Sequence, residues 1–202
     1  IKKTIFITGA SGFIGKNLVE QFKEKYVLLV PGHNELDLLN EKAVNLFFEK
    51  NKKNIVINCA VIGGSRKEEL VDSSLSNNLR IFFNLLKNKD KYKKMIHLGS
   101  GAEYDKSKPI IKVKEADFGK TIPQDEYGFF KYICSKYIEK EENIISLRIF
   151  GLFGKYEDFR YRFISNAIIN DLKGLPITIN QNVFFDYVYI NDFVRIIEYL
   201  IE

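Results

Sequence analysis

Two side chains one helical turn apart, Tyr127 and Lys131, are the best suited in this sequence to acid–base chemistry. They lie in the segment DEYGFFKYICSKY, whose pattern predicts a helix, and residues i and i+4 share one face of a helix. A free phenol has a pKa of about 10, which is too high for proton transfer at neutral pH. A cation one turn away stabilises the phenolate and lowers that pKa. We therefore expect Tyr127 to give or take a proton at a substrate hydroxyl or carbonyl group.

The same spacing recurs at Tyr132 and Lys136, so spacing alone does not identify a site. Tyr132 lies about 140° around the helix from Tyr127. Tyr127 also starts its predicted helix directly after a loop that contains a proline. Ser100 ends a predicted strand, at the edge where parallel sheets bind ligands, and its hydroxyl is either a hydrogen-bond donor to the reacting oxygen or part of a turn.

A second candidate site is the glycine-rich segment TGASGFIG, which follows a predicted strand and opens a predicted helix. Gly9 would allow the tight turn, Gly12 would let the backbone approach a pyrophosphate, and Gly15 would let the helix pack closely on the strand. The free N–H groups and the positive end of the helix favour a phosphate. The spacing is G-x-x-G-x-x-G, which in this strand-to-helix context predicts dinucleotide binding.

The end of the second predicted strand carries information about the dinucleotide. An acid that binds the ribose is expected there, about 20 residues after the loop, but LLVPGHNELDLL has none nearer than Glu35. His33 or neighbouring lysines could instead accommodate a 2′-phosphate, so the sequence leaves NAD and NADP open. Asp37 is either an adenine contact or an acid at the start of the next helix.

Short apolar runs alternate with amphipathic segments over the first 150 residues, which predicts βαβ units and a parallel sheet buried on both faces. The fold class is therefore α/β, a Rossmann-type doubly wound parallel sheet with TIFIT as an interior strand. The predicted strands are 4–8, 26–30, 54–60, 93–100 and 143–150, and the predicted helices are 13–25, 41–50, 77–88 and 126–142.

The alternation breaks after residue 150, where GLFGKYEDFRYRF is aromatic and irregular. We expect residues 1–150 to form a dinucleotide-binding domain and residues 151–202 to begin a smaller substrate lobe. This lobe is predicted to contain a helix over 164–174, short strands over 176–179 and 185–190, and a return helix from Asn191. The chain stops within that helix, so we expect a further C-terminal part of the lobe.

Composition excludes several other classes of protein. The 202 residues are 46% hydrophobic and 28% charged, which is typical of a globular chain rather than a disordered one. No apolar run approaches the roughly 20 residues that span a bilayer, and the N-terminus already has a strand pattern, so we expect a cytoplasmic protein. The net charge of +5 comes from lysines mixed with acids, which favours a solvated surface over a nucleic-acid or membrane partner. Cys59 and Cys134 are expected to be buried thiols, and their spacing predicts no metal site.

Four segments together, TGASGFIG, LGSGAEY, YGFFK and LRIFGLFG, resemble the extended short-chain dehydrogenase/reductase family in their order and spacing. This is the NAD-dependent epimerase/dehydratase group, which acts on nucleotide sugars. The resemblance covers essentially the whole chain, and ELDLLNEKAVNLFF and AVIGG are similar to the GDP-fucose synthase branch. It implies an NAD- or NADP-dependent enzyme of surface polysaccharide sugar synthesis that forms a homodimer.

The resemblance also implies roles for individual positions. Ser100, Tyr127 and Lys131 match the catalytic triad, with Lys131 also holding the nicotinamide ribose. The positions that match cofactor contacts are Gly9, Ser11, Gly12, Phe13, Ile14, Gly15, Asp37, Leu38, Ala60, Val61, Ile62 and Asn78.

This sequence departs from the family at several positions. Gly101 and Ala102 stand where dehydratases carry Asp–Glu, which argues against 4,6-dehydration, and the Cys and His of GDP-fucose synthases are replaced by Ala102 and roughly Arg162. Gly151 replaces a frequent Asn, and Phe185 replaces an Arg that often meets the diphosphate. Arg160 and Arg162 either bind the substrate in its place or only cover the surface of the lobe.

Two classes of function remain open. One is a nucleotide-sugar oxidoreductase or epimerase, in which Tyr127 exchanges a proton with the sugar and Ser100 polarises its carbonyl group. The other is a non-catalytic relative that binds a dinucleotide as a sensor or scaffold. The intact set of Ser100, Tyr127 and Lys131 favours the enzyme.

Overall fold

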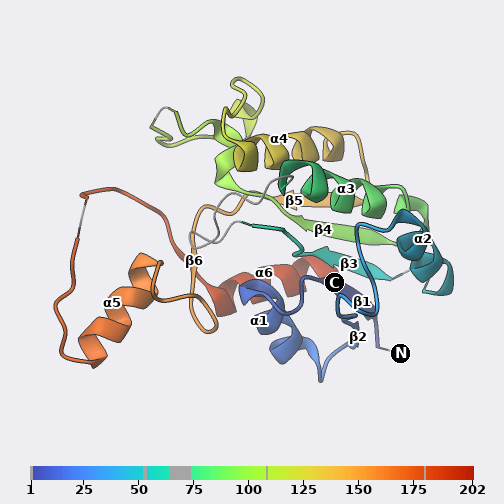
Figure 1. Cartoon of the computed structure of the whole chain (residues 1–202), viewed down its shortest axis with the longest axis horizontal. Coiled ribbons are helices and arrows are strands. Elements are labelled where there is room, and N and C mark those ends of the chain that lie inside the picture. Colours follow the sequence, from blue (N-terminus) through green and yellow to red (C-terminus); the bar gives the residue numbers. More distant parts are fainter. Residues whose placement is uncertain (1, 52–53, 64–73, 108, 180) are drawn as a thin grey trace.

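A computed structural model describes residues 2–51, 54–63, 74–107, 109–179 and 181–202. Its centre is a five-stranded parallel sheet with the strand order β2-β1-β3-β4-β5 (Figure 1). The strands are β1 (Thr4–Thr8), β2 (Val27–Leu29), β3 (Ile55–Asn58), β4 (Lys94–Leu98) and β5 (Ile144–Leu147). The prediction of a parallel, doubly wound Rossmann-type sheet is confirmed, and β1 lies inside it between β2 and β3.

Helices cover both faces of the sheet, because successive residues of each buried strand point to opposite sides. Ile5 and Ile7 of β1 face α1 and α6, whereas Phe6 faces the layer of α2, α3 and α4. The helices are α1 (Phe13–Phe22), α2 (Glu41–Lys50), α3 (Ser74–Leu86), α4 (Glu126–Ile138), α5 (Phe163–Leu172) and α6 (Ile190–Ile201). Short 3₁₀ turns are η1 (Lys89–Lys91), η2 (Gly101–Tyr104) and η3 (Glu115–Asp117).

The chain changes its direction of travel across the sheet after β1. The connection through α1 leads to β2 on one side of β1, and the connection through α2 leads to β3 on the other side. The loops that leave β1 and β3 therefore separate at the carboxyl edge of the sheet, and such a switch point is where open α/β sheets bind ligands.

The region after β5 is more open. Strands β6 (Leu152–Phe153) and β7 (Val188–Tyr189) form a separate two-stranded parallel sheet, and α5 stands away from the main sheet (Figure 1). The strand predicted over 176–179 is wrong, because these residues pair with no strand of the described part of the chain and Ile177 and Ile179 remain exposed. The return helix α6 packs instead on the main core, beside α1.

Candidate active site

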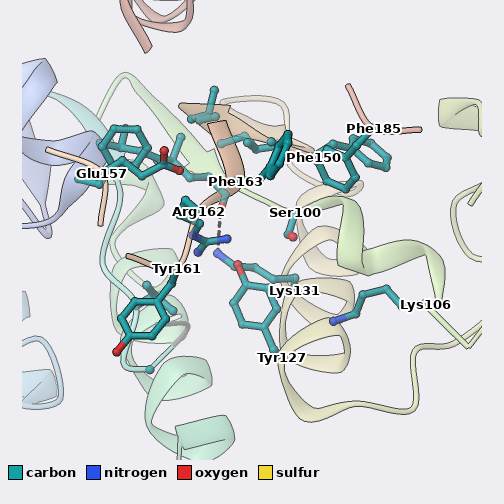
Figure 2. Close-up of a pocket in the computed structure, with 18 of the residues that line it drawn as sticks. Ser100, Lys106, Tyr127, Lys131, Phe150, Glu157, Tyr161, Arg162, Phe163 and Phe185 are labelled. Atoms are coloured by element: carbon teal, nitrogen blue, oxygen red, sulfur yellow. Dashed lines mark hydrogen bonds between the residues drawn. The ribbon is translucent and has the colours of Figure 1, made fainter. Parts of the chain in front are cut away.

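A cavity of about 930 Å³ opens at the carboxyl edge of the main sheet. Its walls come from the start of α1, the segments after β3 and β4, helix α4, and the region between β5 and β7. The three residues of the predicted triad, Ser100, Tyr127 and Lys131, all line it (Figure 2). Residues that are up to 31 positions apart in the sequence therefore meet at one place.

Ser100 follows β4 and is the N-cap of η2. Its side chain accepts a hydrogen bond from the Ala102 amide at 3.1 Å, and its own amide donates to Oε1 of Glu103 at 2.9 Å. This capping box holds the backbone of the serine in place, and it uses the serine oxygen only as an acceptor, so the hydroxyl can still donate a hydrogen bond. Gly128 allows α4 to approach η2, since a Cβ there would lie 2.7 Å from the carbonyl oxygen of Ala102.

Helix α4 brings Tyr127 and Lys131 to the same wall, as their spacing predicted. The phenol oxygen of Tyr127 points into the cavity, toward the side chain of Lys131 (Figure 2). Lys131 is buried, and its Nζ donates to the carbonyl oxygen of Leu98 at 2.6 Å and lies 5.8 Å from the centre of the Tyr127 ring. Tyr132, by contrast, packs against Phe118 and is not part of the cavity wall.

Removal of the polar groups from solvent sets the pKa values of this pair, although Tyr127 as a whole is still 37% exposed and only Lys131 is buried. Loss of solvent raises the pKa of Tyr127, and the hydroxyl of Ser100 and the positive charge of Arg162 oppose that rise. Burial also lowers the pKa of Lys131. The expectation that Lys131 lowers the pKa of Tyr127 is therefore wrong, because desolvation outweighs the opposing effects of Ser100 and Arg162. Tyr127 is a neutral phenol at neutral pH and has a proton to give.

The glycine loop has the conformation that its spacing predicted. Gly9 has a φ of +63°, and a Cβ there would lie 2.8 Å from the carbonyl carbon of Cys59. A Cβ at Gly15 would lie 2.3 Å from the carbonyl oxygen of Gly9, so this glycine allows α1 to pack on the loop. Gly12 differs, because a Cβ there would meet only the carbonyl oxygen of Gly9, at 3.4 Å. The fold therefore does not require a glycine at position 12. A ligand that closely approaches the backbone there would require one.

The other predicted positions of this loop divide into two groups. Phe13 and Ile14 line the cavity, whereas Ser11 is exposed beside it. All of them surround the N-terminus of α1, where free N–H groups favour an anion.

Asn78 positions the segment after β3. Its side chain is buried in α3, accepts from the amide of Ile62 at 2.7 Å and donates to the carbonyl of Ile62 at 2.8 Å. Val61 and Ile62 line the cavity, and the amide of Ala60 donates to the Thr8 hydroxyl. The predicted cofactor-side asparagine thus lines the cavity itself and also holds the backbone of Ile62 in the wall.

Asp37 and Leu38 lie before α2 and are not among the residues that line the cavity. Oδ1 of Asp37 accepts from the Leu39 amide at 2.9 Å, and Asn40 is the N-cap of α2. Asp37 thus organises the turn into the helix, which was one of the two interpretations of this residue.

The two arginines predicted to bind the substrate have different surroundings. The guanidinium of Arg160 is paired with Asp158 at 2.8 Å and is absent from the cavity wall. Arg162 lines the cavity, and its guanidinium points toward Tyr127 and Lys131 (Figure 2). The structure therefore brings only Arg162 to the site.

Two departures from the family pattern are linked in space. A Cβ at Gly151 would lie 2.6 Å from Cε1 of Phe185, so the ring occupies the space that a side chain at 151 would need. Phe150 and Phe185 both line the cavity, and Phe150 stacks on Tyr104 with ring centres 6.1 Å apart. This wall is aromatic where the family often carries a cation.

Sequence reasoning missed a row of polar side chains across the sheet. Thr8, Asn58 and His97 are paired in register on β1, β3 and β4. The hydroxyl of Thr8 donates to Asn58 at 2.7 Å, and the Asn58 amide lies 3.0 Å from Nδ1 of His97. Burial and the charge of Lys131 lower the pKa of His97 well below its usual value. The signal was a polar residue at or next to the end of three apolar strands that are neighbours in the sheet.

Both cysteines are free thiols, as expected. Cys134 is buried in α4, but Cys59 is only half-buried and lines the cavity, which corrects the prediction that both are buried. Loss of solvent raises the pKa of the Cys59 thiol to about 12. Neither thiol is therefore a nucleophile at neutral pH.

Within the described ranges, the histidines, cysteines and acids form no cluster that could hold a metal ion. In the same ranges, every helix is too short or too polar to cross a bilayer.

The strand order, the glycine loop and the convergence of Ser100, Tyr127 and Lys131 define a Rossmann-type α/β protein with a polar site at its switch point. The model of the NAD dependent epimerase/dehydratase family matches residues 5–202, and the chain belongs to this family. A curated relative, GDP-L-colitose synthase of Yersinia pseudotuberculosis, is 28% identical over 172 residues, which cover 77% of this chain and 54% of that protein. The chain thus spans about half the length of this curated relative.

Solved structures share the fold at low sequence identity. A GDP-6-OMe-4-keto-L-xylo-heptose reductase from C. jejuni is 22% identical, with a TM-score of 0.78 over 99% of this chain and 72% of that one. A GDP-L-fucose synthetase from Naegleria fowleri, solved with NADP bound, is 20% identical, with a TM-score of 0.75 over 96% of this chain and 71% of that one.

Proposed function

We propose that this chain belongs to an NAD(P)-dependent oxidoreductase or epimerase that acts on a nucleotide-linked sugar, with Tyr127 as its acid–base group. The observation that carries the proposal is the convergence of Ser100, Tyr127 and Lys131 on a cavity that also reaches Phe13 at the glycine loop. Hydride-transfer enzymes need an acid–base group beside the dinucleotide, and this cavity has room for both. Its volume is at the upper end of the range for small-molecule sites.

The chain's residues fit a dinucleotide. Gly12 has open space above its backbone, and the start of α1 offers free N–H groups to a pyrophosphate. The segment held by Asn78 would flank the cofactor, and Lys131 would hold its ribose. When such a dinucleotide is bound, its nicotinamide ring would donate or accept the hydride. The lack of an acid directly after β2 and the NADP named with the Naegleria structure both favour NADP over NAD.

The protein's part in the reaction is proton transfer. In the reductive direction, the phenol of Tyr127 donates its proton to the carbonyl oxygen of a keto sugar and becomes a phenolate. The cations Lys131 and Arg162 stabilise that phenolate until solvent returns the proton. The hydroxyl of Ser100 donates a hydrogen bond to the same oxygen and withdraws charge from it. In an epimerase, the phenolate form of Tyr127 would first remove a proton from a sugar hydroxyl and then return it.

We favour reduction of a GDP-linked 4-keto sugar. The colitose, heptose and fucose relatives carry GDP in their printed names, and one of them is a 4-keto reductase. The absence of the Asp–Glu pair at Gly101 and Ala102 argues against dehydration. This chain spans only 54% of the curated relative. The test of the sugar site therefore uses the full-length protein.

The test is oxidation of NADPH by the full-length protein with a GDP-linked 4-keto-6-deoxyhexose as the probe. Tyr127→Phe removes only the hydroxyl, so turnover is expected to fall by roughly 10²–10⁴-fold while cofactor affinity is kept. Tyr132→Phe is the matched control, because this tyrosine lies on the same helix outside the cavity. Parental turnover by Tyr127→Phe, or equal damage from Tyr132→Phe, would contradict the proposal. Tight NADPH binding without turnover of any GDP- or UDP-linked keto sugar would support the alternative, a dinucleotide sensor.

A further inference from the structure

The buried carboxylate of Glu103 lies directly behind the candidate active site. The residue is 1% exposed, within the turn η2 that follows Ser100. Its Oε1 accepts from the amide of Ser100 at 2.9 Å, and its Oε2 accepts from Nε of Arg148 at 2.9 Å. Helix α4 packs against η2, the turn that contains this carboxylate.

The two partners come from the ends of neighbouring strands of the sheet. Ser100 follows β4 and Arg148 follows β5, while α4 packs against the turn η2. The carboxylate thus joins the turn that carries Ser100 to the end of β5, and that turn packs on the helix that carries Tyr127 and Lys131.

The lack of a side chain at Gly99 leaves room for this carboxylate. A Cβ at Gly99 would lie 2.6 Å from Oε1 of Glu103 and 2.7 Å from the hydroxyl of Ser146, so position 99 has no room for a side chain. The Arg148 side chain is 19% exposed, and its guanidinium stacks on the ring of Phe118 at 4.3 Å. Both members of the pair are held by packing as well as by charge.

Stability alone is a poor reason for such a pair. Desolvation of two charges often cancels their attraction, and replacement of a buried ion pair by apolar side chains of similar size is often neutral or stabilising. The turn also has a hydrogen bond that does not use the carboxylate, from the amide of Ala102 to the Ser100 hydroxyl. The ion pair of Glu103 and Arg148 adds a link from the Ser100 amide to the end of β5, which helps to fix the position of Ser100 relative to α4.

We propose that Glu103 and Arg148 form a positioning pair, which holds the Ser100 hydroxyl at the distance from Tyr127 that proton transfer requires. The inference rests on the proposed function of Ser100 and Tyr127. The pair does not touch the substrate and acts through the Ser100 amide. Misplacement of an active-site group by about 1 Å can lower the rate by roughly 10²-fold, which is the effect expected when the pair is removed.

The test compares Glu103→Met with the double variant Glu103→Met/Arg148→Met in the full-length protein. The single variant leaves the guanidinium unpaired and is expected to be less stable. The double variant removes both charges, so its free energy of unfolding is expected to return to the parental value while kcat stays roughly 10²-fold low. KM and the Kd of NADPH are expected to remain within threefold of the parent. A double variant with parental stability and parental kcat would overturn the proposal, because the pair would then have only a structural role.

The matched control is Lys89→Met/Glu141→Met, which removes a pair at 2.6 Å outside the cavity wall and is expected to keep the parental kcat. A crystal structure of the Glu103→Met/Arg148→Met variant gives a readout that needs no substrate. We expect η2 and the Ser100 hydroxyl to be displaced from Tyr127, and an unchanged Ser100 position would overturn the proposal. Tyr127→Phe in the same turnover assay separates the two hypotheses, because parental turnover by that variant contradicts the proposed function rather than the positioning role.

Discussion

Two glycine-to-alanine variants in the glycine loop can separate what folding requires from what cofactor binding requires. Each variant adds one methyl group, at position 15 or at position 12. Gly15→Ala would place its Cβ 2.3 Å from the carbonyl oxygen of Gly9 and 2.7 Å from Cα of Ala10. Both contacts are with backbone, which cannot move away as a flexible side chain would. Gly12→Ala would place its Cβ 3.4 Å from the carbonyl oxygen of Gly9, with an extended backbone that alanine adopts readily.

The expected magnitudes follow from these contacts. Overpacking costs about 1–3 kcal/mol, and two backbone contacts this short place Gly15→Ala at about 3 kcal/mol. For a chain of this size that loss corresponds to a fall in Tm of roughly 6–12 °C. Gly12→Ala is expected to change the free energy of unfolding by less than about 1 kcal/mol, because the lower entropy of its unfolded chain offsets a poorer helix cap.

Ligand affinity is expected to follow the opposite order. A methyl group at position 12 stands where a pyrophosphate must approach the loop, and each charge-assisted hydrogen bond that is lost costs about 1.5–3 kcal/mol. The Kd of NADPH for Gly12→Ala is therefore expected to rise by at least tenfold, since about 1.4 kcal/mol is a factor of ten.

Denaturant unfolding and titration calorimetry with NADPH on both variants measure the two quantities separately. NADPH binding by Gly12→Ala as tight as in the parent would contradict a role of Gly12 in cofactor binding. Destabilisation of Gly12→Ala equal to that of Gly15→Ala would contradict the separation of the two roles, because position 12 would then serve the fold.

Two other predictions concern buried polar side chains. Asn78→Leu leaves the amide and carbonyl of Ile62 without their side-chain partner, so NADPH affinity is expected to fall by roughly tenfold; calorimetry with unchanged affinity would show that these bonds do not hold the wall. His97 titrates at about pH 6.5 in an unfolded chain and well below that in the folded one, so protons bind preferentially to the unfolded state as the pH falls below about 6.5. The free energy of unfolding is expected to fall by up to about 1.4 kcal/mol per pH unit through this residue, and equal slopes for the parent and His97→Gln between pH 7 and pH 5 would contradict the assignment.

Local features of the chain were determined by the sequence itself. The strand Thr4–Thr8, the glycine turn and the start of α1 at Phe13 follow from the periodicity and the backbone freedom of adjacent residues. The common face of Tyr127 and Lys131 follows from their spacing in a helix. Parallel sheet order then brings Ser100 to the same edge, because loops that leave parallel strands meet there.

Only the tertiary structure decided how these residues behave. The pKa of Tyr127 is raised because segments far away in the sequence partly desolvate its hydroxyl, and Phe185 fills the space beside Gly151 because β7 pairs with β6. Residues 176–179 have a strand pattern but pair with no strand within the described ranges. Spacing along the chain encodes faces and turns, whereas burial, pairing and desolvation depend on partners that are far away in the sequence.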